Sequence, residues 1–181
     1  LAEAEIDGER LTDREIVMTS ATFVMAGIES LSSFMTMLAL NLNDHAEARR
    51  RLAADPSLMG QAIDESLRFN TSAQRFKRTA ARNKQLHGKT IRTGDTVILA
   101  YGSANRDPRK FPNPDLYDID RKPVGHLGFG GGKHFCMGSQ MARFVTDVSM
   151  RRFLARIPEF RLTADKLDWI SSSNFRSPIA L

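Results

Sequence analysis

The sequence predicts a mainly α-helical fold with a small β-sheet component, an α+β arrangement in one domain. Three observations predict it. Apolar residues recur with a helical period over residues 12–41 and again over residues 137–156. Between these segments, residues 71–99 become polar and β-like, and Gly88 and Gly94 mark turns. At 181 residues, the chain is long enough to form one domain with a real core.

Composition excludes several classes of protein. The chain has 26 Lys and Arg against 21 Asp and Glu, a net charge of +5. This excess is modest and we expect it to be spread along the chain, so it does not argue for nucleic-acid binding. A single cysteine, Cys136, excludes an internal disulfide framework and suits a reducing compartment. The first residues lack signal-peptide character, and we expect a cytoplasmic protein.

The first predicted helix is long and unusually apolar. Thr12 and Glu15 have the spacing of a capping box, and a helix over residues 12–41 is about 45 Å long. Its apolar residues lie on more than one side, which indicates burial in something large or a membrane span. Glu29, in its middle, costs roughly 2.5 kcal/mol or more at the centre of a bilayer. Seven serines and threonines dilute the apolarity further, so we expect a central core helix and no membrane partner.

The remaining elements follow from caps, breakers and periodicity. Asn43 or Asp44 is expected to cap a second helix that ends near Leu52, and a third helix is expected over residues 57–69. Short strands are expected at Phe76–Thr79, 85–86, Thr96–Leu99, 160–162 and 177–181. The last helix has a candidate core face made of Met141, Phe144, Val145, Val148, Phe153 and Leu154.

A glycine-rich loop, residues 129–138, precedes the last helix and reads Phe-Gly-Gly-Gly-Lys-His-Phe-Cys-Met-Gly. Glycine allows unusual backbone angles and close approach of the main chain to a ligand. A thiol at a helix N-terminus is a favourable place for a thiolate. The residues alone leave three interpretations of Cys136: a buried small hydrophobe, a nucleophile with His134 as its base, or an axial thiolate ligand of haem iron.

The spacing of residues in this loop resembles a known signature. Phe129, Gly132, His134, Cys136 and Gly138 fill every fixed position of F-x-x-G-x-[RH]-x-C-x-G, the haem-ligand motif of cytochrome P450 enzymes. The resemblance, to soluble bacterial members, implies haem b as cofactor and Cys136 as its metal ligand. It also places Phe129, Gly130, His134 and Gly138 in the cofactor-binding loop. The implied activity is a monooxygenase that uses O2 to hydroxylate a small organic substrate.

The centre of the long helix carries a second match. Ala26-Gly27-Ile28-Glu29-Ser30 is similar to the family's oxygen-binding segment, A-G-x-[DE]-T. The resemblance implies that Ala26 and Gly27 lie against haem and that Glu29 and Ser30 are catalytic groups that deliver protons. The alternative is a helix kink with a satisfied buried carboxylate. Ser30 replaces the family's usual threonine and lacks the methyl group that restricts χ1, so we expect its hydroxyl to be held more loosely.

Glu65 and Arg68 stand three residues apart on the third helix. Taken alone they indicate a surface ion pair worth under ~1 kcal/mol. They also resemble the family's E-x-x-R pair, which is buried, supports folding and takes a third partner from a later irregular segment, here Arg121.

Two further cations are expected to bind haem propionates by the same resemblance. Arg78 fits the family's strand arginine, although Arg75 and Arg82 are rivals, and His126 fits a histidine ahead of the loop. The alternatives are a solvated strand residue and a structural histidine. Residues 172–175 are expected near the substrate.

The resemblance covers only the C-terminal half of such an enzyme, so residues 1–181 are expected to form a single partial domain. We expect this chain alone to expose a large apolar patch and to dimerise or exchange elements. The implied electron donor is a ferredoxin-type protein that meets a basic surface including Lys133 and Arg143. The competing hypothesis is a non-catalytic or haem-free fragment that keeps the motifs.

Overall fold

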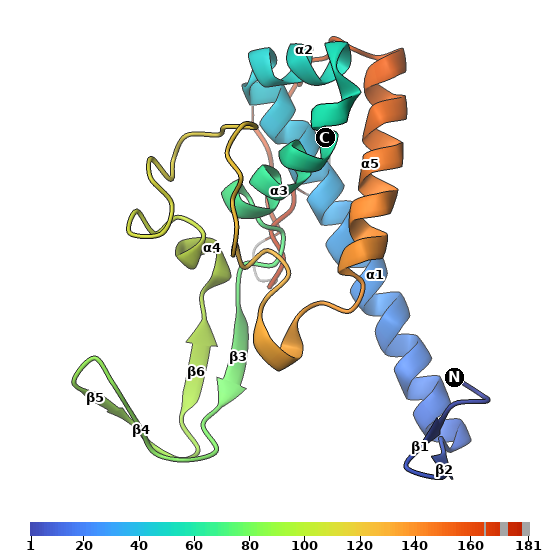
Figure 1. Cartoon of the computed structure of the whole chain (residues 1–181), viewed down its shortest axis with the longest axis vertical. Coiled ribbons are helices and arrows are strands. Elements are labelled where there is room, and N and C mark those ends of the chain that lie inside the picture. Colours follow the sequence, from blue (N-terminus) through green and yellow to red (C-terminus); the bar gives the residue numbers. More distant parts are fainter. Residues whose placement is uncertain (165, 171–173, 179–181) are drawn as a thin grey trace.

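The long helix α1 is the axis of the structure (Figure 1). The computed structural model describes residues 1–164, 166–170 and 174–178. Helices α2, α3 and α5 gather around the C-terminal half of α1, and the strands and the irregular segments lie beside α3. The helices are α1 (Asp13–Asp44), α2 (Ala46–Ala54), α3 (Met59–Phe69), α4 (Tyr101–Ala104) and α5 (Ser139–Arg156), with short 3-10 turns at Pro56–Leu58 and Gly132–His134.

The capping box predicted for α1 is confirmed. The backbone N–H of Glu15 donates to Thr12 Oγ1 at 3.3 Å, and the backbone N–H of Thr12 donates to Glu15 Oε2 at 2.9 Å. The backbone N–H groups of Thr12 and Glu15 are therefore each satisfied by the side chain of the other residue.

The prediction of a core helix holds only for the C-terminal part of α1, and its exposed N-terminal half agrees with the apolar patch expected of this chain alone. The residues of α1 in the core begin at Ser33, and they pack with α2, α3 and α5 around Leu38, Ile63 and Leu154. The apolar side chains that stay exposed on its N-terminal half are Val17, Met18, Phe23, Val24, Met25 and Ile28. Among the described residues, no other element packs over these side chains. By length and composition alone α1 is apolar enough to cross a membrane, but the core helix of a soluble protein meets the same criteria.

The core face predicted for α5 is correct only in part. Leu154 is buried and Phe153 packs against the core, as predicted, whereas Met141, Phe144 and Val148 are exposed. Thr146 and Met150, which were not predicted, are also buried where α5 contacts α2 and α3.

The start of α2 was predicted wrongly. His45 occupies the N-cap without capping the helix through its side chain, whose Nδ1 lies 2.8 Å from the Asn41 carbonyl, and neither Asn43 nor Asp44 caps the helix. The side chain of Asn43 is used elsewhere, because its Oδ1 accepts the backbone N–H of Leu162 at 2.8 Å. No strand forms at residues 160–162, where one was predicted, and the backbone N–H of Leu162 is bonded to this side chain instead of to a neighbouring strand.

The strands form three separate two-stranded antiparallel sheets among the described residues. The predicted strands β3 (Phe76–Thr79) and β6 (Thr96–Leu99) are confirmed, and they pair with each other, with Phe76 opposite Leu99. The other pairs are β4 (Lys84–Leu86) with β5 (Lys89–Ile91), and β1 (Glu5–Ile6) with β2 (Glu9–Arg10). Near the C-terminus the described residues form two isolated bridges, Trp169 with Pro178 and Phe175 with Ala73. Residues 179–181, part of a predicted strand, lie outside the described residues.

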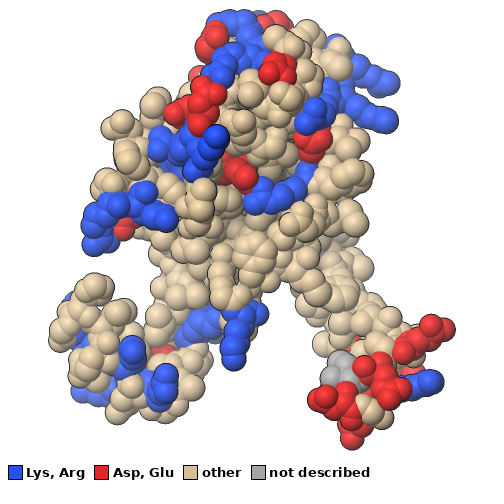
Figure 2. Space-filling model, in the orientation of Figure 1, with Lys and Arg blue, Asp and Glu red and all other residues tan. Residues whose placement is uncertain are grey.

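Positive charge is not spread evenly, contrary to the expectation. Residues 75–95 hold seven Lys and Arg and one acid, Asp95, a net charge of +6, so the rest of the chain is −1. Figure 2 shows this basic region on the arm that ends in the β4–β5 hairpin, whereas acidic side chains gather at the N-terminal end of α1. Mostly uncharged side chains lie between the two arms.

Candidate functional site

The sequence's lone thiol lies on a tightly folded loop, which we call the cysteine loop (residues 126–138). Gly130 and Gly132 have φ of +70° and +62°, in the left-handed region that favours glycine. The backbone N–H of Cys136 donates to the Phe129 carbonyl at 2.9 Å, which closes the loop. Cys136 is exposed and stands just before α5, so its thiol is presented to any group that docks there.

Phe129 anchors the cysteine loop to the protein. Its ring is half-buried and packs against the core, with the ring of Phe135 at 6.3 Å and the guanidinium of Arg143 at 5.1 Å from its centroid. A Cβ on Gly128 would lie 2.8 Å from the Leu67 carbonyl oxygen, so the loop backbone is in direct contact with α3. The interpretation of Cys136 as a buried hydrophobe is therefore wrong, because the loop is anchored by Phe129 and leaves the thiol outside.

The predicted residues of α1 lie on its exposed half. Ala26, Gly27 and Glu29 are exposed, and Ser30 is half-buried and donates from Oγ to the Ala26 carbonyl at 2.5 Å. A Cβ on Gly27 would meet nothing within 4 Å. The alternative of a buried carboxylate at Glu29 does not hold for the chain described here.

Exposed apolar side chains flank both parts of the site. Near the thiol they are Phe135, Met137 and Met141, and on α1 they include Val24 and Ile28. An exposed thiol, open space over Gly27 and apolar flanks suit a flat, largely apolar macrocycle with a thiolate-liganded metal. The residues present therefore fit haem.

His126 lies at the base of the cysteine loop and not at its open side. Its Nδ1 accepts the backbone N–H of Gly128 at 3.1 Å, and its Nε2 lies 3.6 Å from Asp64 Oδ1. Burial, with a smaller effect of the Arg68 cation, lowers the pKa of His126, and the Glu65 carboxylate opposes the shift. The ring is therefore neutral at neutral pH and carries its proton on Nε2.

The other expected cofactor contacts are dispersed. Arg78 lies on β3, half-buried, and donates to the Lys77 carbonyl at 2.9 Å. His134 is exposed in the 3-10 turn next to Cys136. Of the segment expected near the substrate, residues 172–173 lie outside the described residues, and the Phe175 ring packs at 6.2 Å from that of Phe76.

The predicted support network behind the loop is confirmed. Glu65 and Arg68 are fully buried, and two hydrogen bonds of 2.8 and 2.7 Å join the guanidinium to the carboxylate. Arg121 Nε adds a bond of 3.2 Å to Glu65 Oε1. Arg68 also donates to the carbonyls of Asn105, Pro114 and Leu116, which fixes the irregular segment against α3.

Asn105 is a functional position for which the sequence indicated no role. It is completely buried, its Oδ1 accepts the backbone N–H of Leu127 at 2.7 Å, and its Nδ2 donates to the Leu67 carbonyl at 3.2 Å. One amide thus links α3 to the start of the cysteine loop. The only sequence signal was an amide in the segment Ala104-Asn105-Arg106-Asp107-Pro108.

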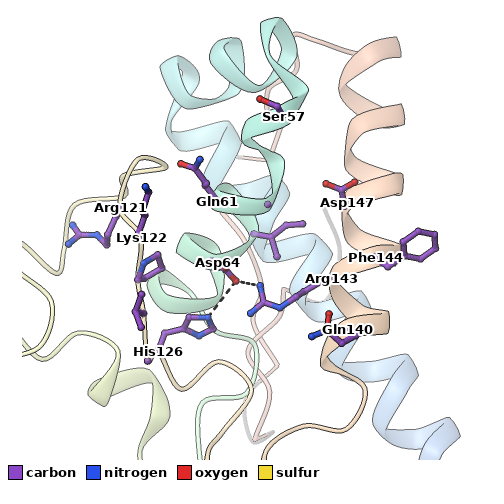
Figure 3. Close-up of a pocket in the computed structure, with 15 residues that line it drawn as sticks. Ser57, Gln61, Asp64, Arg121, Lys122, His126, Gln140, Arg143, Phe144 and Asp147 are labelled. Carbon is purple, nitrogen blue, oxygen red and sulfur yellow. Dashed lines mark hydrogen bonds and ion pairs between the residues drawn. The ribbon is translucent and has the colours of Figure 1, made fainter.

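A cavity of about 700 Å³ lies beside this network, between α3, the segment 121–126 and α5 (Figure 3). Asp64 is at its centre and faces both His126 and Arg143. Burial lowers the pKa of Arg143, whose guanidinium is partly withdrawn from water by the loop.

An exposed loop thiol at the start of a helix, with surroundings that fit haem, is the arrangement expected of the haem-thiolate class of proteins. A family model described as "Cytochrome P450" matches residues 1–175, and the chain belongs to that family. The biotin biosynthesis cytochrome P450 of Bacillus subtilis (strain 168) is 38% identical over 85% of this chain and 39% of the relative. Nocardicin C N-oxygenase of Nocardia uniformis subsp. tsuyamanensis is 37% identical over 97% of this chain and 45% of the relative.

The fold comparison agrees. The structure of cytochrome P450 CYP109Q5 from Chondromyces apiculatus matches 99% of this chain and 46% of its own with a TM-score of 0.93 and 36% identity. The chain therefore spans less than half the length of the relatives it matches.

Proposed function

We propose that this chain is the C-terminal, haem-binding half of a cytoplasmic haem-thiolate monooxygenase that hydroxylates a small organic substrate. The observation that carries the proposal is the exposed thiol of Cys136 on a loop pinned by Phe129 and shaped by Gly130 and Gly132. Haem, when bound, supplies a redox-active iron whose thiolate ligand favours O–O cleavage. The remaining half of the domain would come from further polypeptide, since this chain spans less than half of its relatives.

Each predicted site residue has a place in this proposal. Cys136 ligates the iron, and its loop accommodates the macrocycle with Gly138 at the start of α5. Ala26 and Gly27 leave room for the haem beside α1, because neither carries a side chain larger than methyl. Glu29 and Ser30 follow Gly27 within one turn of α1, and they move protons through a carboxylate and a hydroxyl.

Arg78 and His126 are proposed to bind the haem propionates, together with His134. Arginine suits a carboxylate because its planar fork is permanently charged. For His126 the donor would be the Nε2 proton that now points towards Asp64, so propionate binding requires a change of partner, and in the haem-bound protein Arg143 would be the remaining contact between Asp64 and the cysteine loop.

The cofactor is proposed to be haem b, held without covalent links. Attachment through thioethers uses a C-x-x-C-H motif, and the chain has one cysteine. Haem that extracts intact into acidified organic solvent supports haem b, whereas haem that stays with the polypeptide contradicts it.

The electron donor is proposed to be an acidic ferredoxin-type protein. Lys133 is exposed on the turn beside Cys136 and is available to meet it, whereas Arg143 is engaged with Asp64. Reversing the charge with Lys133→Glu should slow reduction and leave the haem spectrum unchanged. Unchanged reduction kinetics in this variant would contradict the assignment.

The decisive experiment is the optical spectrum of the intact protein with haem, reduced and exposed to carbon monoxide. We expect the red-shifted band of thiolate ligation in the wild type and its loss in Cys136→Ser. The matched control is Met137→Leu, on the exposed neighbouring residue, which should keep the band. If Cys136→Ser keeps it too, Cys136 is not the ligand; if the wild type takes up no haem, the haem-free alternative holds.

A further inference from the structure

Asp64 joins three parts of the molecule that are far apart in sequence. It projects from α3 into the cavity, and its Oδ1 pairs with Arg143 Nη1 from α5 and faces His126 Nε2 from the cysteine loop at 3.6 Å (Figure 3). Its neighbour Glu65 is fully buried instead and belongs to the network with Arg68 and Arg121. The two adjacent acids therefore serve different partners.

Arg143 transmits this contact to the loop. Its guanidinium carbon lies 5.1 Å from the centroid of the Phe129 ring, a cation–π distance, while the carboxylate of Asp64 holds the guanidinium from the other end. The side chains of Arg143 and Asp64 are 31% and 36% exposed, so the pair is partly withdrawn from water. It is therefore less screened than a fully exposed surface pair.

His126 transmits the contact by a second route. Its Nδ1 accepts the N–H of Gly128, so in the neutral ring the proton stands on Nε2, on the side of Asp64. Gly128 touches Leu67 of α3 and precedes Phe129 directly. Both routes from Asp64 therefore end at Phe129, whose carbonyl accepts the N–H of Cys136 at 2.9 Å.

We propose that Asp64 is a positioning residue that clamps the cysteine loop to α3 through Arg143 and His126 and so fixes where Cys136 presents its thiol. The two arginines of the cavity already have partners: Arg143 pairs with Asp64, and Arg121 donates to Glu65 and to the carbonyls of Pro112 and Asn113. The part of the proposal that concerns haem depends on the proposed function; the part that concerns the loop does not.

The test compares three variants of the intact protein. Asp64→Asn keeps the shape of the side chain and removes its charge, and Arg143→Gln removes the charge from the other side. The matched control is Asp147→Asn, because Asp147 lines the same cavity but pairs with Arg151 of its own helix at 2.8 Å. Far-UV circular dichroism first establishes that each variant is folded.

The first readout is hydrogen exchange of peptides from residues 128–136 in the haem-free protein. Loss of the clamp should speed their exchange roughly fivefold, the factor expected for one net hydrogen bond. Exchange in α2 should not change. The second readout, in the haem-loaded protein, is the fraction of the carbon monoxide complex that shows thiolate ligation, which should fall in Asp64→Asn and stay at the wild-type level in Asp147→Asn.

The clamp also predicts that the effects of Asp64→Asn and Arg143→Gln on hydrogen exchange in the loop are not additive. In the Arg143→Gln background, Asp64→Asn should have a smaller effect than it has alone, because the contact with Arg143 is already lost and only the contact with His126 remains. Independent, additive effects on exchange, or equal effects of Asp64→Asn and Asp147→Asn, overturn the proposal. If Asp64→Asn does not fold, Arg143→Gln alone decides: faster loop exchange supports the clamp and unchanged exchange refutes it. A wild type without thiolate ligation would refute the proposed function and leave the exchange result standing.

Discussion

Removing the charge of Glu65 should be among the most destabilising single changes in this chain. Its carboxylate is completely buried and accepts hydrogen bonds from Arg68 Nε and Nη2, from Arg121 Nε and from the backbone N–H of Asp118. Glu65→Gln keeps the shape but leaves the buried Arg68 without its counter-charge. Breaking a buried pair in this way costs about 3–5 kcal/mol, a large share of the ~5–15 kcal/mol by which domains are stable.

The chain contains a matched control for burial. Glu47 and Arg50 on α2 have the same i, i+3 spacing and a similar separation, 2.9 Å against 2.7 Å, but their side chains are 74% and 58% exposed. Glu47→Gln should therefore cost under ~1 kcal/mol. Added salt should weaken this exposed pair and leave the buried one largely unaffected.

The assay is equilibrium unfolding of the intact protein by urea, followed by circular dichroism with and without added salt. Glu65→Gln should lower the unfolding midpoint strongly and Glu47→Gln hardly at all. Equal midpoints for the two variants would refute the reasoning, because the two pairs differ mainly in burial and in the additional bonds that burial permits.

Three other predictions can be checked directly. Gly128→Ala places a Cβ 2.8 Å from the Leu67 carbonyl oxygen and should cost about 1–3 kcal/mol by overpacking; a stability equal to wild type in urea unfolding would contradict the close approach. Burial lowers the pKa of His126 below its ordinary value, so the unfolded state binds more protons and stability should fall as pH drops from about 6.5 towards the lowered pKa. His126→Gln should flatten that dependence of the urea midpoint; an unchanged slope would show that other groups cause it. The isolated 181-residue chain should self-associate in sedimentation, and Met25→Glu, at an exposed position of α1, should reduce this; a monodisperse wild-type monomer would rule the expectation out.

Short-range contacts account for the parts of the fold that the sequence predicts correctly. Thr12 and Glu15 reach each other within one helical turn, so a capping box needs no tertiary partner. The strands at Phe76–Thr79 and Thr96–Leu99 are likewise delimited by turn signals that lie close to them in the chain. The errors fall where a distant group intervenes, as at Asn43, whose side chain holds the backbone of Leu162 instead of capping α2.

The sequence by itself located the candidate site, because the spacing of Cys136, His134 and the loop glycines is a short-range property of the chain. It also determined the Glu65–Arg68 pairing, which i, i+3 spacing brings together on one helix. Only the tertiary structure decided which contacts hold that loop in place. Asp64, Asn105 and Arg143 act across α3, the irregular segment and α5, and no periodicity along the chain encodes which buried donor meets which acceptor once those elements pack.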